Sequence, residues 1–466
     1  MEFHLRLTGD SHQQLKQHLF PGDEKEAIAF ALCGRHSTGN QKWLLVHRLL
    51  FVPHAACIRK GDFIEWPTNL IDELVDEAAQ KGMGILKIHS HPKGDTYFSE
   101  LDDESDHIIF PSIYALMNDD EPHFSAIMYE DESIIARAVT ANNEFLSVDK
   151  VTIVGDTVKL MRSKNDFIAH DASLRNRQTF GEGTVSLLKN LTVVVIGCSG
   201  TGSIVIEQLA RLGVGKLIIA DSKPVDYKNL NRILNSTEED ARHKRPKVEV
   251  LKAAITSFGF NTEVEIYQSL VQEDPRLINA VISSDFVFGC VDSVEGRSIA
   301  NSLATFYLFP YIDMGVKLVA DKQGGIDEIS GSVHYLQPGK SSLLSRGVYT
   351  IQQLSAEELK RTNPVMYEDQ RKRGYVVNMD VESPAVISIN MQVASLAVLE
   401  FLARIHPFRY DPNKRFAQTD ISISDWEIWP SEEGTPDKYL AKFAGRGLMQ
   451  PFLNLSSLSS LWSADS

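Results

Sequence analysis

Cysteine and long apolar runs are both scarce in this sequence. Its 466 residues include four cysteines, Cys33, Cys57, Cys198 and Cys290, and no two of them form a CxxC pair. Such usage is not that of a disulfide-bonded secreted domain, and it favours reduced thiols in a cytoplasmic protein. No run reaches the roughly 18 apolar residues of a membrane span, and the first 20 residues lack the apolar core of a signal peptide. We therefore expect a cytoplasmic protein with no membrane partner.

Positive charge is scarce as well. The sequence has 47 lysines and arginines against 62 aspartates and glutamates, for a formal net charge of −15. A nucleic acid is therefore not an expected partner, because surfaces that bind nucleic acids are rich in basic residues. The composition, with 43% hydrophobic and 23% charged residues, is typical of a soluble globular protein. The length favours two domains with extensions.

The first part of the chain carries the pattern of a mixed domain. Apolar runs such as 25–35 and 85–91 predict strands, and the spacing of apolar residues over 67–81 predicts an amphipathic helix. We expect residues 1–155 to form an α+β domain in which helices flank a β-sheet. The charged segment that follows, 156–185, is predicted to be a linker of helix and loop.

A different pattern begins at residue 186. A strand over 191–197, a glycine turn, a helix and a second strand over 216–221 follow one another. This order predicts a βαβ unit at the start of a doubly wound, Rossmann-like α/β domain. We expect that domain to span 186–425. The pattern weakens over 426–466, which we expect to be a C-terminal extension.

Side chains that bind metals gather at the strand predicted over 85–91. His89 and His91 lie two residues apart on an extended segment and point to the same side, and Asp102 follows eleven residues after His91. Two imidazoles and a carboxylate give zinc three protein ligands and leave its fourth position open for water, as in catalytic zinc sites. The alternative for Ser99 and Asp102 is a helix capping pair, which has closely similar spacing.

This segment, HSHPKGDTYFSELD, resembles the JAMM (JAB/MPN) metalloprotease motif, HxHP followed by SxxD. The resemblance implies a domain that cleaves after the C-terminal glycine of a ubiquitin-like protein. It also implies that His89, His91 and Asp102 are zinc ligands and that Ser99 helps to hold the tetrahedral oxyanion.

The same family needs a glutamate upstream that acts as general base toward the attacking water. Glu26, in EAIAFALCG, precedes an apolar run at the family's position, and Glu24 is the alternative. A different possibility for the whole domain is a docking module without catalytic activity. The complete ligand set argues against that possibility.

Three glycines lie at the end of the strand over 191–197 and just after it. Gly197, Gly200 and Gly202 lie in VVVIGCSGTGS, between this strand and the next helix. Such a turn lets backbone amides approach phosphates at a helix N-terminus. Asp221, at the end of the next strand, is placed to accept hydrogen bonds from a ribose. These residues suit both an ATP-dependent enzyme and an NAD-dependent dehydrogenase.

Charged residues farther along favour ATP. Asn229 and Arg232 lie one turn apart, Lys247 opens another helix, and Asp292 ends a later strand. Arginine and lysine near a glycine turn offer positive charge to a triphosphate, and a carboxylate at the end of a strand is suited to Mg²⁺. A hydride-transfer enzyme does not need this cationic set.

Together, the segments GCSGTGS, NLNR, RPKV and CVDS resemble the ThiF/MoeB/HesA superfamily, which includes the ubiquitin-activating enzymes. The resemblance covers the chain from about residue 170 to 420. It implies that the three glycines line an ATP site, that Asp221 binds the ribose and that Asp292 binds Mg²⁺. By the same resemblance, Asn229, Arg232 and Lys247 contact the phosphates.

Arg177, in RNRQ, matches the arginine that such enzymes supply across a dimer interface, so a homodimer is expected. Two positions depart from the family pattern. Lys223 stands where the family usually has an acid, and this reversed charge bears on metal binding. Ser199 replaces a usual glycine, and its small side chain leaves ATP binding possible.

Many relatives also form a thioester on a cysteine after the Mg²⁺-binding aspartate, but the last cysteine here is Cys290. Ser342 and Ser345 stand where many relatives carry a CxxC pair for structural zinc, so that zinc is not expected here. Three outcomes stay open. The acyl-adenylate is released to a partner, an oxyester forms on Ser342, Ser345 or a neighbour, or serine has replaced cysteine in this particular chain.

We therefore predict a bifunctional enzyme. It adenylates the C-terminal glycine carboxylate of a ubiquitin-like protein with ATP and Mg²⁺, and its zinc-dependent N-terminal domain processes or deconjugates that protein. A bacterial ubiquitin-like conjugation pathway, with a conjugating-enzyme-like partner and a role in antiviral defence, is the expected setting. The alternative is a sulfur-carrier-protein adenylyltransferase for cofactor biosynthesis, whose JAMM domain only trims the carrier.

Overall fold

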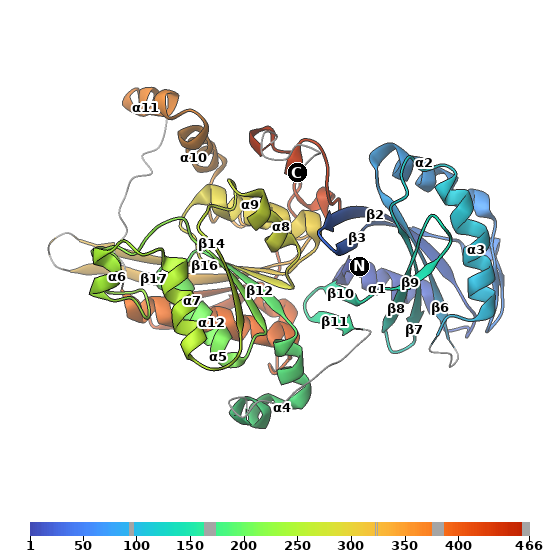
Figure 1. The fold of residues 1–466 in the computed structure, drawn as a ribbon, viewed down its shortest axis with the longest axis horizontal. Helices are drawn as coiled ribbons and strands as arrows, with labels where there is room; N and C mark the ends of the chain where they lie inside the picture. The colour runs from blue at the N-terminus through green and yellow to red at the C-terminus, as the bar shows by residue number, and fades with distance from the viewer. Residues whose placement is uncertain (93–96, 163–173, 322, 324, 375–385, 459–466) are drawn as a thin grey trace. The chain divides into compact units, whose positions relative to one another are not determined.

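The structure is a computed structural model that describes residues 1–92, 97–162, 174–321, 323, 325–374 and 386–458. The chain divides into two compact units, and Figure 1 shows the elements of each. The first unit contains the described residues up to Arg162 together with Thr305–Leu308 and Phe443–Met449. The second contains the other described residues, and each unit has its own large sheet.

A nine-stranded mixed sheet forms the frame of the first unit. Its strands lie in the order β11-β10-β1-β3-β2-β6-β7-β8-β9. Their bounds are β1 Glu2–Thr8, β2 Ile28–Thr38, β3 Gln41–Phe51, β6 Gly84–His91, β7 His123–Tyr129, β8 Ile134–Val139, β9 Phe145–Ser147, β10 Lys150–Val154 and β11 Val158–Arg162. Beside it, β4 (Ile58–Arg59) and β5 (Ile64–Glu65) form a small two-stranded sheet.

Helices cover both faces of the nine-stranded sheet. Residues of α1 (Gly9–Leu19) join the core on one face, and residues of α2 (Asp72–Lys81) and α3 (Glu100–Tyr114) join the core on the other. Side chains alternate along a strand, so each central strand contributes to both cores. On β6, Leu86 and Ile88 face α1, whereas Ile85 faces α2 and α3. The histidines of β6 therefore point to the side of α3.

The first unit extends past residue 155, where the sequence pattern predicted that the domain ends. β10 pairs in parallel with β1 and antiparallel with β11, so the sheet continues to Arg162. The register joins His4 to Lys150, and a pairing between such distant segments leaves no local signal in the sequence. Residues 163–173 of the predicted linker lie outside the described part of the chain.

An eight-stranded sheet forms the frame of the second unit, in the order β14-β13-β12-β15-β16-β17-β18-β19. Neighbours from β14 to β16 pair in parallel, and neighbours from β16 to β19 pair antiparallel. The bounds are β12 Thr192–Ile196, β13 Lys216–Ala220, β14 Glu263–Tyr267, β15 Phe286–Gly289, β16 Tyr311–Ala320, β17 Ile326–Leu336, β18 Gln418–Ser422 and β19 Glu427–Ser431. β19 shows that the sheet continues past residue 425.

Helices lie on both faces of this sheet, with α8 and α9 across the sheet from α5 and α12 in Figure 1. The fold class predicted from the sequence, an α+β domain followed by a doubly wound α/β domain, is confirmed. The helix bounds are α4 Leu174–Lys189, α5 Gly200–Leu212, α6 Glu238–Arg242, α7 Lys247–Ser257, α8 Pro275–Ile282, α9 Val294–Tyr307, α10 Ile351–Thr362, α11 Pro364–Lys372 and α12 Ile387–Ile405.

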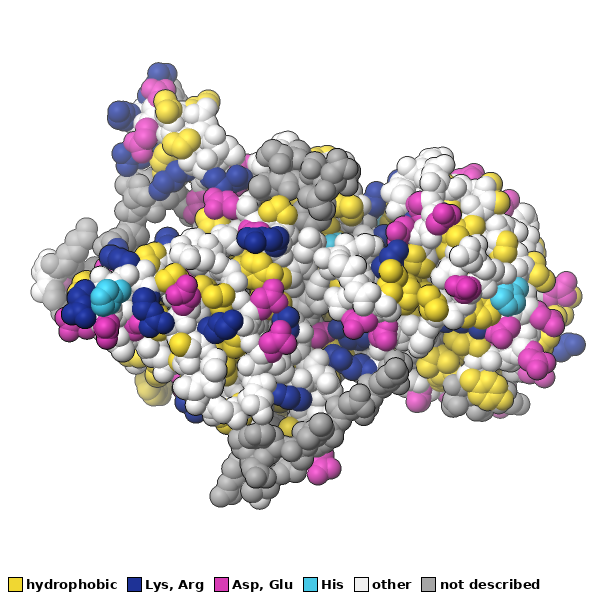
Figure 2. Space-filling model, viewed as in Figure 1, with side chains coloured by type: hydrophobic (Ala, Val, Ile, Leu, Met, Phe, Trp, Pro, Cys, Tyr) yellow, Lys and Arg dark blue, Asp and Glu magenta, His cyan; other side chains and the backbone are white. Residues whose placement is uncertain are grey.

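Among the described helices, α12 is the one that is long and apolar enough to cross a membrane. It packs against α5, β16 and β17, and 61% of its most apolar window is buried. Burial of that kind is typical of the core helix of a folded domain. On the face shown in Figure 2, basic and acidic side chains are interspersed over both units.

Candidate functional site

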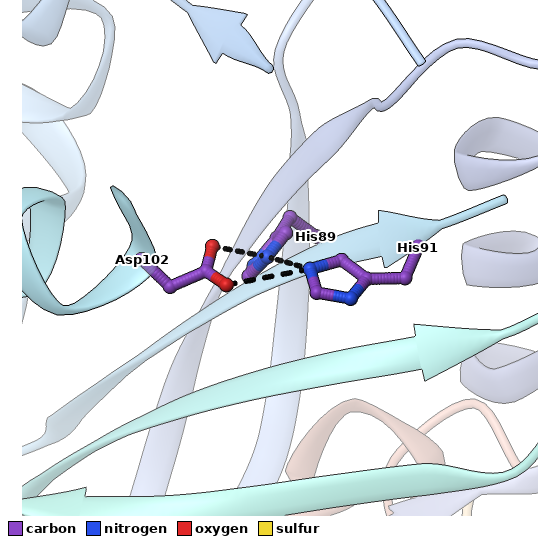
Figure 3. Close-up of side chains that lie close together, drawn as sticks. All are labelled: His89, His91 and Asp102. Atoms are coloured by element: carbon purple, nitrogen blue, oxygen red, sulfur yellow. Dashed lines mark hydrogen bonds and ion pairs between the residues drawn. The ribbon is translucent and has the colours of Figure 1, made fainter. Parts of the chain in front are cut away.

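The three residues predicted as metal ligands lie together where β6 ends and α3 begins (Figure 3). The Nε2 atom of His89 is 2.8 Å from one carboxylate oxygen of Asp102, and Nε2 of His91 is 3.4 Å from the other. The two Nε2 atoms are 3.1 Å apart. One ligand atom from each residue lies within 4.8 Å of the others, and no other such group of three occurs among the described residues.

The start of α3 fixes the carboxylate of this group. Ser99 Oγ accepts a hydrogen bond from Asp102 N at 3.2 Å, while Ser99 N donates to Asp102 Oδ2 at 2.7 Å. This reciprocal pair is a capping box. Ser99 Oγ also donates to Asp102 Oδ2 at 2.8 Å. The capping alternative therefore holds in the structure, and it orients Asp102 toward the histidines without excluding it as a ligand.

Burial and hydrogen bonding shift the pKa values of two members of this group. Burial lowers the pKa of His89, although Asp102 opposes the shift. Burial disfavours the charged form of Asp102, but hydrogen bonds from His89 and His91 outweigh that effect and hold its pKa well below the usual range. Two imidazole nitrogens and one carboxylate oxygen that converge on one point are a donor set suited to zinc. The residues present therefore fit the metal that the motif implies.

Glu26 lies beside these ligands, just before β2. Its Oε1 atom is 3.9 Å from Nε2 of His91, and its side chain is buried. Burial raises the pKa of Glu26 to about 7, with His91 opposing the shift. The backbone is held from the β4 side, because Glu26 N donates to Lys60 O at 2.8 Å and Arg59 Nε donates to Glu26 O at 2.6 Å. The alternative glutamate, Glu24, is exposed.

Arg59 was not among the residues predicted for this site. Besides its bond to the Glu26 carbonyl, it pairs with Asp23 at 2.8 Å and donates to Lys25 O at 3.1 Å. Arg59 thus holds the segment that leads into Glu26. An arginine in a two-residue strand gives no sequence signal for such a contact, because the contact depends on how the loops pack.

Three of the residues predicted to bind nucleotide lie at the carboxyl edge of the second sheet. β13, β12 and β15 are parallel neighbours, so their carboxyl ends meet at one edge. Gly197 follows β12, Asp221 follows β13 and Asp292 lies shortly after β15. From β12 the sheet grows toward β13 and β14 on one side and toward β15 and β16 on the other. The glycine turn therefore lies at the topological switch point, where open α/β sheets bind their ligands.

Asp221 is held between the glycine turn and a buried lysine. Its Oδ2 accepts a hydrogen bond from Cys198 N at 2.9 Å, and its Oδ1 accepts one from Lys223 N at 2.9 Å. Lys247 is buried at the start of α7, and its Nζ lies 3.2 Å from Asp221 Oδ2. Lys223, which stands where the family usually has an acid, is exposed and supports Asp221 through its backbone.

Arg232 approaches the turn near the start of α5. A Cβ atom placed on Gly200 would lie 3.3 Å from Arg232 Cδ. Arg232 is half-buried, and its Nη1 donates to Lys228 O at 2.7 Å. Asn229 is buried, and its amide oxygen accepts a hydrogen bond from Asp226 N at 3.1 Å. Asn229 therefore shapes the turn that carries Arg232.

Asp292 is exposed and lies two residues beyond Cys290, which contacts the turn. A Cβ atom on Gly197 would lie 2.5 Å from the carbonyl oxygen of Cys290. The structure thus brings Asp221, Lys247 and Arg232 to the turn, with Asp292 on the adjoining loop. Arg177 lies on α4, and its side chain is outside the part that the structure describes.

Two of the glycines are required by geometry. Gly197 has a φ of +97°, which lies in the left-handed region that favours glycine. A Cβ atom on Gly202 would lie 1.9 Å from the carbonyl oxygen of Gly197, so α5 begins in direct contact with the turn. This close packing brings the first amides of α5 to the sheet edge.

We expect Gly202→Ala to push α5 away from β12, to lower the free energy of unfolding by about 1–3 kcal/mol and to weaken ATP binding. Thermal unfolding and nucleotide titration measure both effects. Gly183→Ala on α4 is the matched control, because an added Cβ meets nothing within 4 Å there. That substitution should leave stability unchanged or raise it by up to about 1 kcal/mol. Equal melting temperatures for Gly202→Ala and wild type contradict the packing described.

The two cysteines at the turn and the two serines considered as acyl acceptors are all shielded or hydrogen-bonded. Cys198 is buried and Cys290 is half-buried, and burial raises the pKa of both thiols, so both stay protonated at neutral pH. Ser342 is buried and its hydroxyl donates to Asp437. Ser345 Oγ accepts from Ser342 N at 2.8 Å. These contacts disfavour an oxyester on either serine.

Sequence profiles of two families match the chain. The ThiF family profile matches residues 172–438, which is more than half of the chain. The chain belongs to the ThiF family. A second profile, of prokaryotic homologs of the JAB domain, matches residues 10–133 of this ThiF-family protein. Both resemblances drawn from the motifs are confirmed.

Curated relatives of this ThiF-family protein share only part of its length. Ubiquitin-like modifier-activating enzyme 5 of Caenorhabditis briggsae is 28% identical over 165 residues, which is 33% of this chain and 36% of the relative. The tRNA threonylcarbamoyladenosine dehydratase of Bacillus subtilis (strain 168) is 39% identical over 120 residues, 26% of this chain and 46% of the relative. The chain thus spans less than half of the length of either.

Solved structures are similar to part of the chain. The crystal structure of E. coli MccB with ATP is 18% identical and covers 60% of this chain and 75% of its own, with a TM-score of 0.43. That of selenomethionine PaaA is 20% identical and covers 58% of this chain and 87% of its own, with a TM-score of 0.38.

Proposed function

We propose that the second unit of this protein uses ATP to adenylate the C-terminal glycine carboxylate of a ubiquitin-like protein. The gathering of Asp221, Lys247 and Arg232 around the Gly197 turn carries this proposal. Membership in the ThiF family supports ATP as the co-substrate. A relative named as a ubiquitin-like modifier-activating enzyme supports a protein carboxylate as the group that is activated.

Each residue contributes one interaction to this reaction. Asp221 accepts hydrogen bonds from the ribose, and the first amides of α5 meet the phosphates. A carboxylate oxygen of the substrate forms a bond to the α-phosphorus while the bond to pyrophosphate breaks, and Lys247 and Arg232 stabilise the charge that develops. Asp292 would hold Mg²⁺, which supplies positive charge to the phosphates.

We also propose that the first unit is a peptidase or isopeptidase that acts on the same ubiquitin-like protein. His89, His91 and Asp102 would hold zinc, which supplies Lewis acidity and lowers the pKa of a bound water to about 7. Glu26 takes a proton from the attacking water and gives it to the leaving amine. Ser99 Oγ turns from Asp102 toward the oxyanion. Cleavage exposes the glycine carboxylate that the second unit activates.

The acyl-adenylate then passes to a partner protein, in this proposal, because burial raises the pKa of Cys198 and Cys290 and because the hydroxyl of Ser342 is buried and bonded to Asp437. A conjugating-enzyme-like protein supplies the acceptor. The active form is a homodimer in which Arg177 reaches the nucleotide of the other copy. We propose a cytoplasmic bacterial pathway, with antiviral defence as its role.

Pyrophosphate exchange tests the adenylation. With Mg²⁺ and a glycine-terminated ubiquitin-like protein from the same genome, labelled pyrophosphate should enter ATP. Removing the terminal glycine of the protein substrate should stop the exchange. Exchange that proceeds equally without any protein substrate contradicts the proposal.

A sulfur-carrier protein is the second candidate substrate. The absence of a cysteine after Cys290 fits release of the adenylate to a sulfur donor as well as to a conjugating protein. The mass of the product distinguishes the two, because one route gives a C-terminal thiocarboxylate and the other gives an amide to a lysine. If a thiocarboxylate is the sole product, sulfur transfer and not conjugation is the function.

A further inference from the structure

A buried ion-pair cluster lies next to the zinc ligands and joins three elements. Lys87 on β6, Asp106 on α3 and Arg137 on β8 are 3%, 0% and 7% exposed. Lys87 Nζ donates to Asp106 Oδ1 at 2.6 Å. Arg137 donates to Asp106 Oδ2 from Nε at 3.1 Å and from Nη2 at 2.7 Å. Both carboxylate oxygens of Asp106 are therefore occupied by cations.

The Lys87–Asp106 pair has the same strand-to-helix arrangement as the metal site, two residues earlier on β6 and about one turn later on α3. Lys87 is two residues before His89, so both side chains leave β6 on the face toward α3. Asp106 is four residues after Asp102, so both lie on the same side of α3. The Lys87–Asp106 pair thus spans the same gap between strand and helix that His89 and Asp102 span.

Arg137 contacts the chain on both sides of the ligand Asp102. Its Nη1 donates to Asp103, the next residue along α3. Its guanidinium lies 4.0 Å from the ring centre of Phe98, which directly precedes Ser99, and 3.6 Å from that of Phe145. One side chain therefore contacts the chain before the capping serine and after the ligand.

Stability alone is a weak reason for this arrangement. Taking charges out of water is costly, and well-packed apolar residues in place of a buried ion pair often give an equally stable or more stable protein. What an ion pair adds is direction and distance, since its hydrogen bonds fix one geometry. The two cations are matched by the two carboxylates of Asp103 and Asp106, so the cluster leaves no net charge beside the metal site.

We propose that Lys87, Asp106 and Arg137 are positioning residues that set the separation of α3 from β6 to the one that zinc needs. They keep Asp102 within reach of His89 and His91 when the metal is absent. The inference rests on the proposed function of the first unit, because it requires that this unit binds zinc.

The test is the zinc affinity of the full-length Lys87→Met, Asp106→Leu double variant, measured by competition with a chelating dye. This variant removes one cation and one anion together and leaves Arg137 paired with Asp103. We expect the melting temperature of the metal-free double variant to match or exceed that of wild type and its zinc affinity to fall about tenfold or more, as for groups that orient metal ligands. A folded double variant with wild-type zinc affinity overturns the inference.

The control is Lys42→Met with Glu121→Leu, which removes a pair of similar length, 2.7 Å, at the surface of the same unit. Its zinc affinity should equal that of wild type, and a loss as large as that of the first double variant overturns the inference. If Lys87→Met, Asp106→Leu does not fold, Arg137→Lys replaces it. This variant keeps a cation near Asp106 but loses the two guanidinium hydrogen bonds to Asp106 and the contacts with the rings of Phe98 and Phe145. Unchanged zinc affinity in this variant also overturns the inference. Wild-type protein that fails to bind zinc overturns the proposed peptidase as well.

Discussion

Glu26→Gln will cleave a ubiquitin-like precursor about 10²–10⁴-fold more slowly than wild type and will bind zinc as tightly. The carboxylate lies 3.9 Å from His91 Nε2, beside the three ligands rather than among them. A neutral amide of the same shape cannot accept the proton of the attacking water. Cleavage of a precursor with residues beyond its terminal glycine, followed by mass spectrometry, measures the rate.

The matched control is Glu24→Gln, because Glu24 lies two residues away and is exposed. It should cleave at the wild-type rate. Loss of cleavage in Glu24→Gln with full activity in Glu26→Gln would move the general base to Glu24. Loss of zinc binding in Glu26→Gln would make Glu26 a ligand instead of a base.

Asp292→Asn will lower pyrophosphate exchange about 100-fold or more, because a metal contributes several kcal/mol of charge stabilisation and each 1.4 kcal/mol is a factor of ten in rate. Asp292 is exposed, so its substitution should not disturb folding. Raising the Mg²⁺ concentration should recover part of the lost rate, since the amide weakens metal binding without blocking the site.

Glu263→Gln is the control for that experiment. Glu263 begins β14 and so lies at the amino end of the parallel strands, whereas the glycine turn lies at their carboxyl end. Its carboxylate pairs with Lys216 at 3.0 Å. Its exchange rate and Mg²⁺ dependence should be those of wild type. An Asp292→Asn variant with unchanged exchange would place the metal ligand elsewhere and would separate this chain from the pattern of its family.

The parts of both sites that depend on local sequence were predictable. The spacing of His89, His91 and Asp102 follows from strand alternation and a helix cap, and the glycine turn follows from the order strand, glycines, helix. The β10–β11 hairpin was not predictable, because β10 finds its partner β1 at the far end of the domain. The same limit applies to Arg59, whose contact with Glu26 depends on loop packing.

The Lys87 cluster was missed although the sequence held a signal for it. Lys87 interrupts the apolar run ILKIHSH, and every residue of β6 is buried. A cation in the middle of such a strand needs a buried anion, because an unpaired charge is too costly inside a protein. What the sequence does not reveal is which acid supplies it, since α3 carries Asp102, Asp103 and Asp106 close together.

Cys198 lies in the glycine turn, Cys290 lies against it, and burial raises the pKa of both thiols. Alkylating agents and peroxides attack the thiolate, so neither residue offers them a ready target. A reactive cysteine that carried an acyl group would be inactivated by its own oxidation. If this centre activates a carboxylate as proposed, it would keep turning over in a cell exposed to oxidants, and iodoacetamide should leave its pyrophosphate exchange intact.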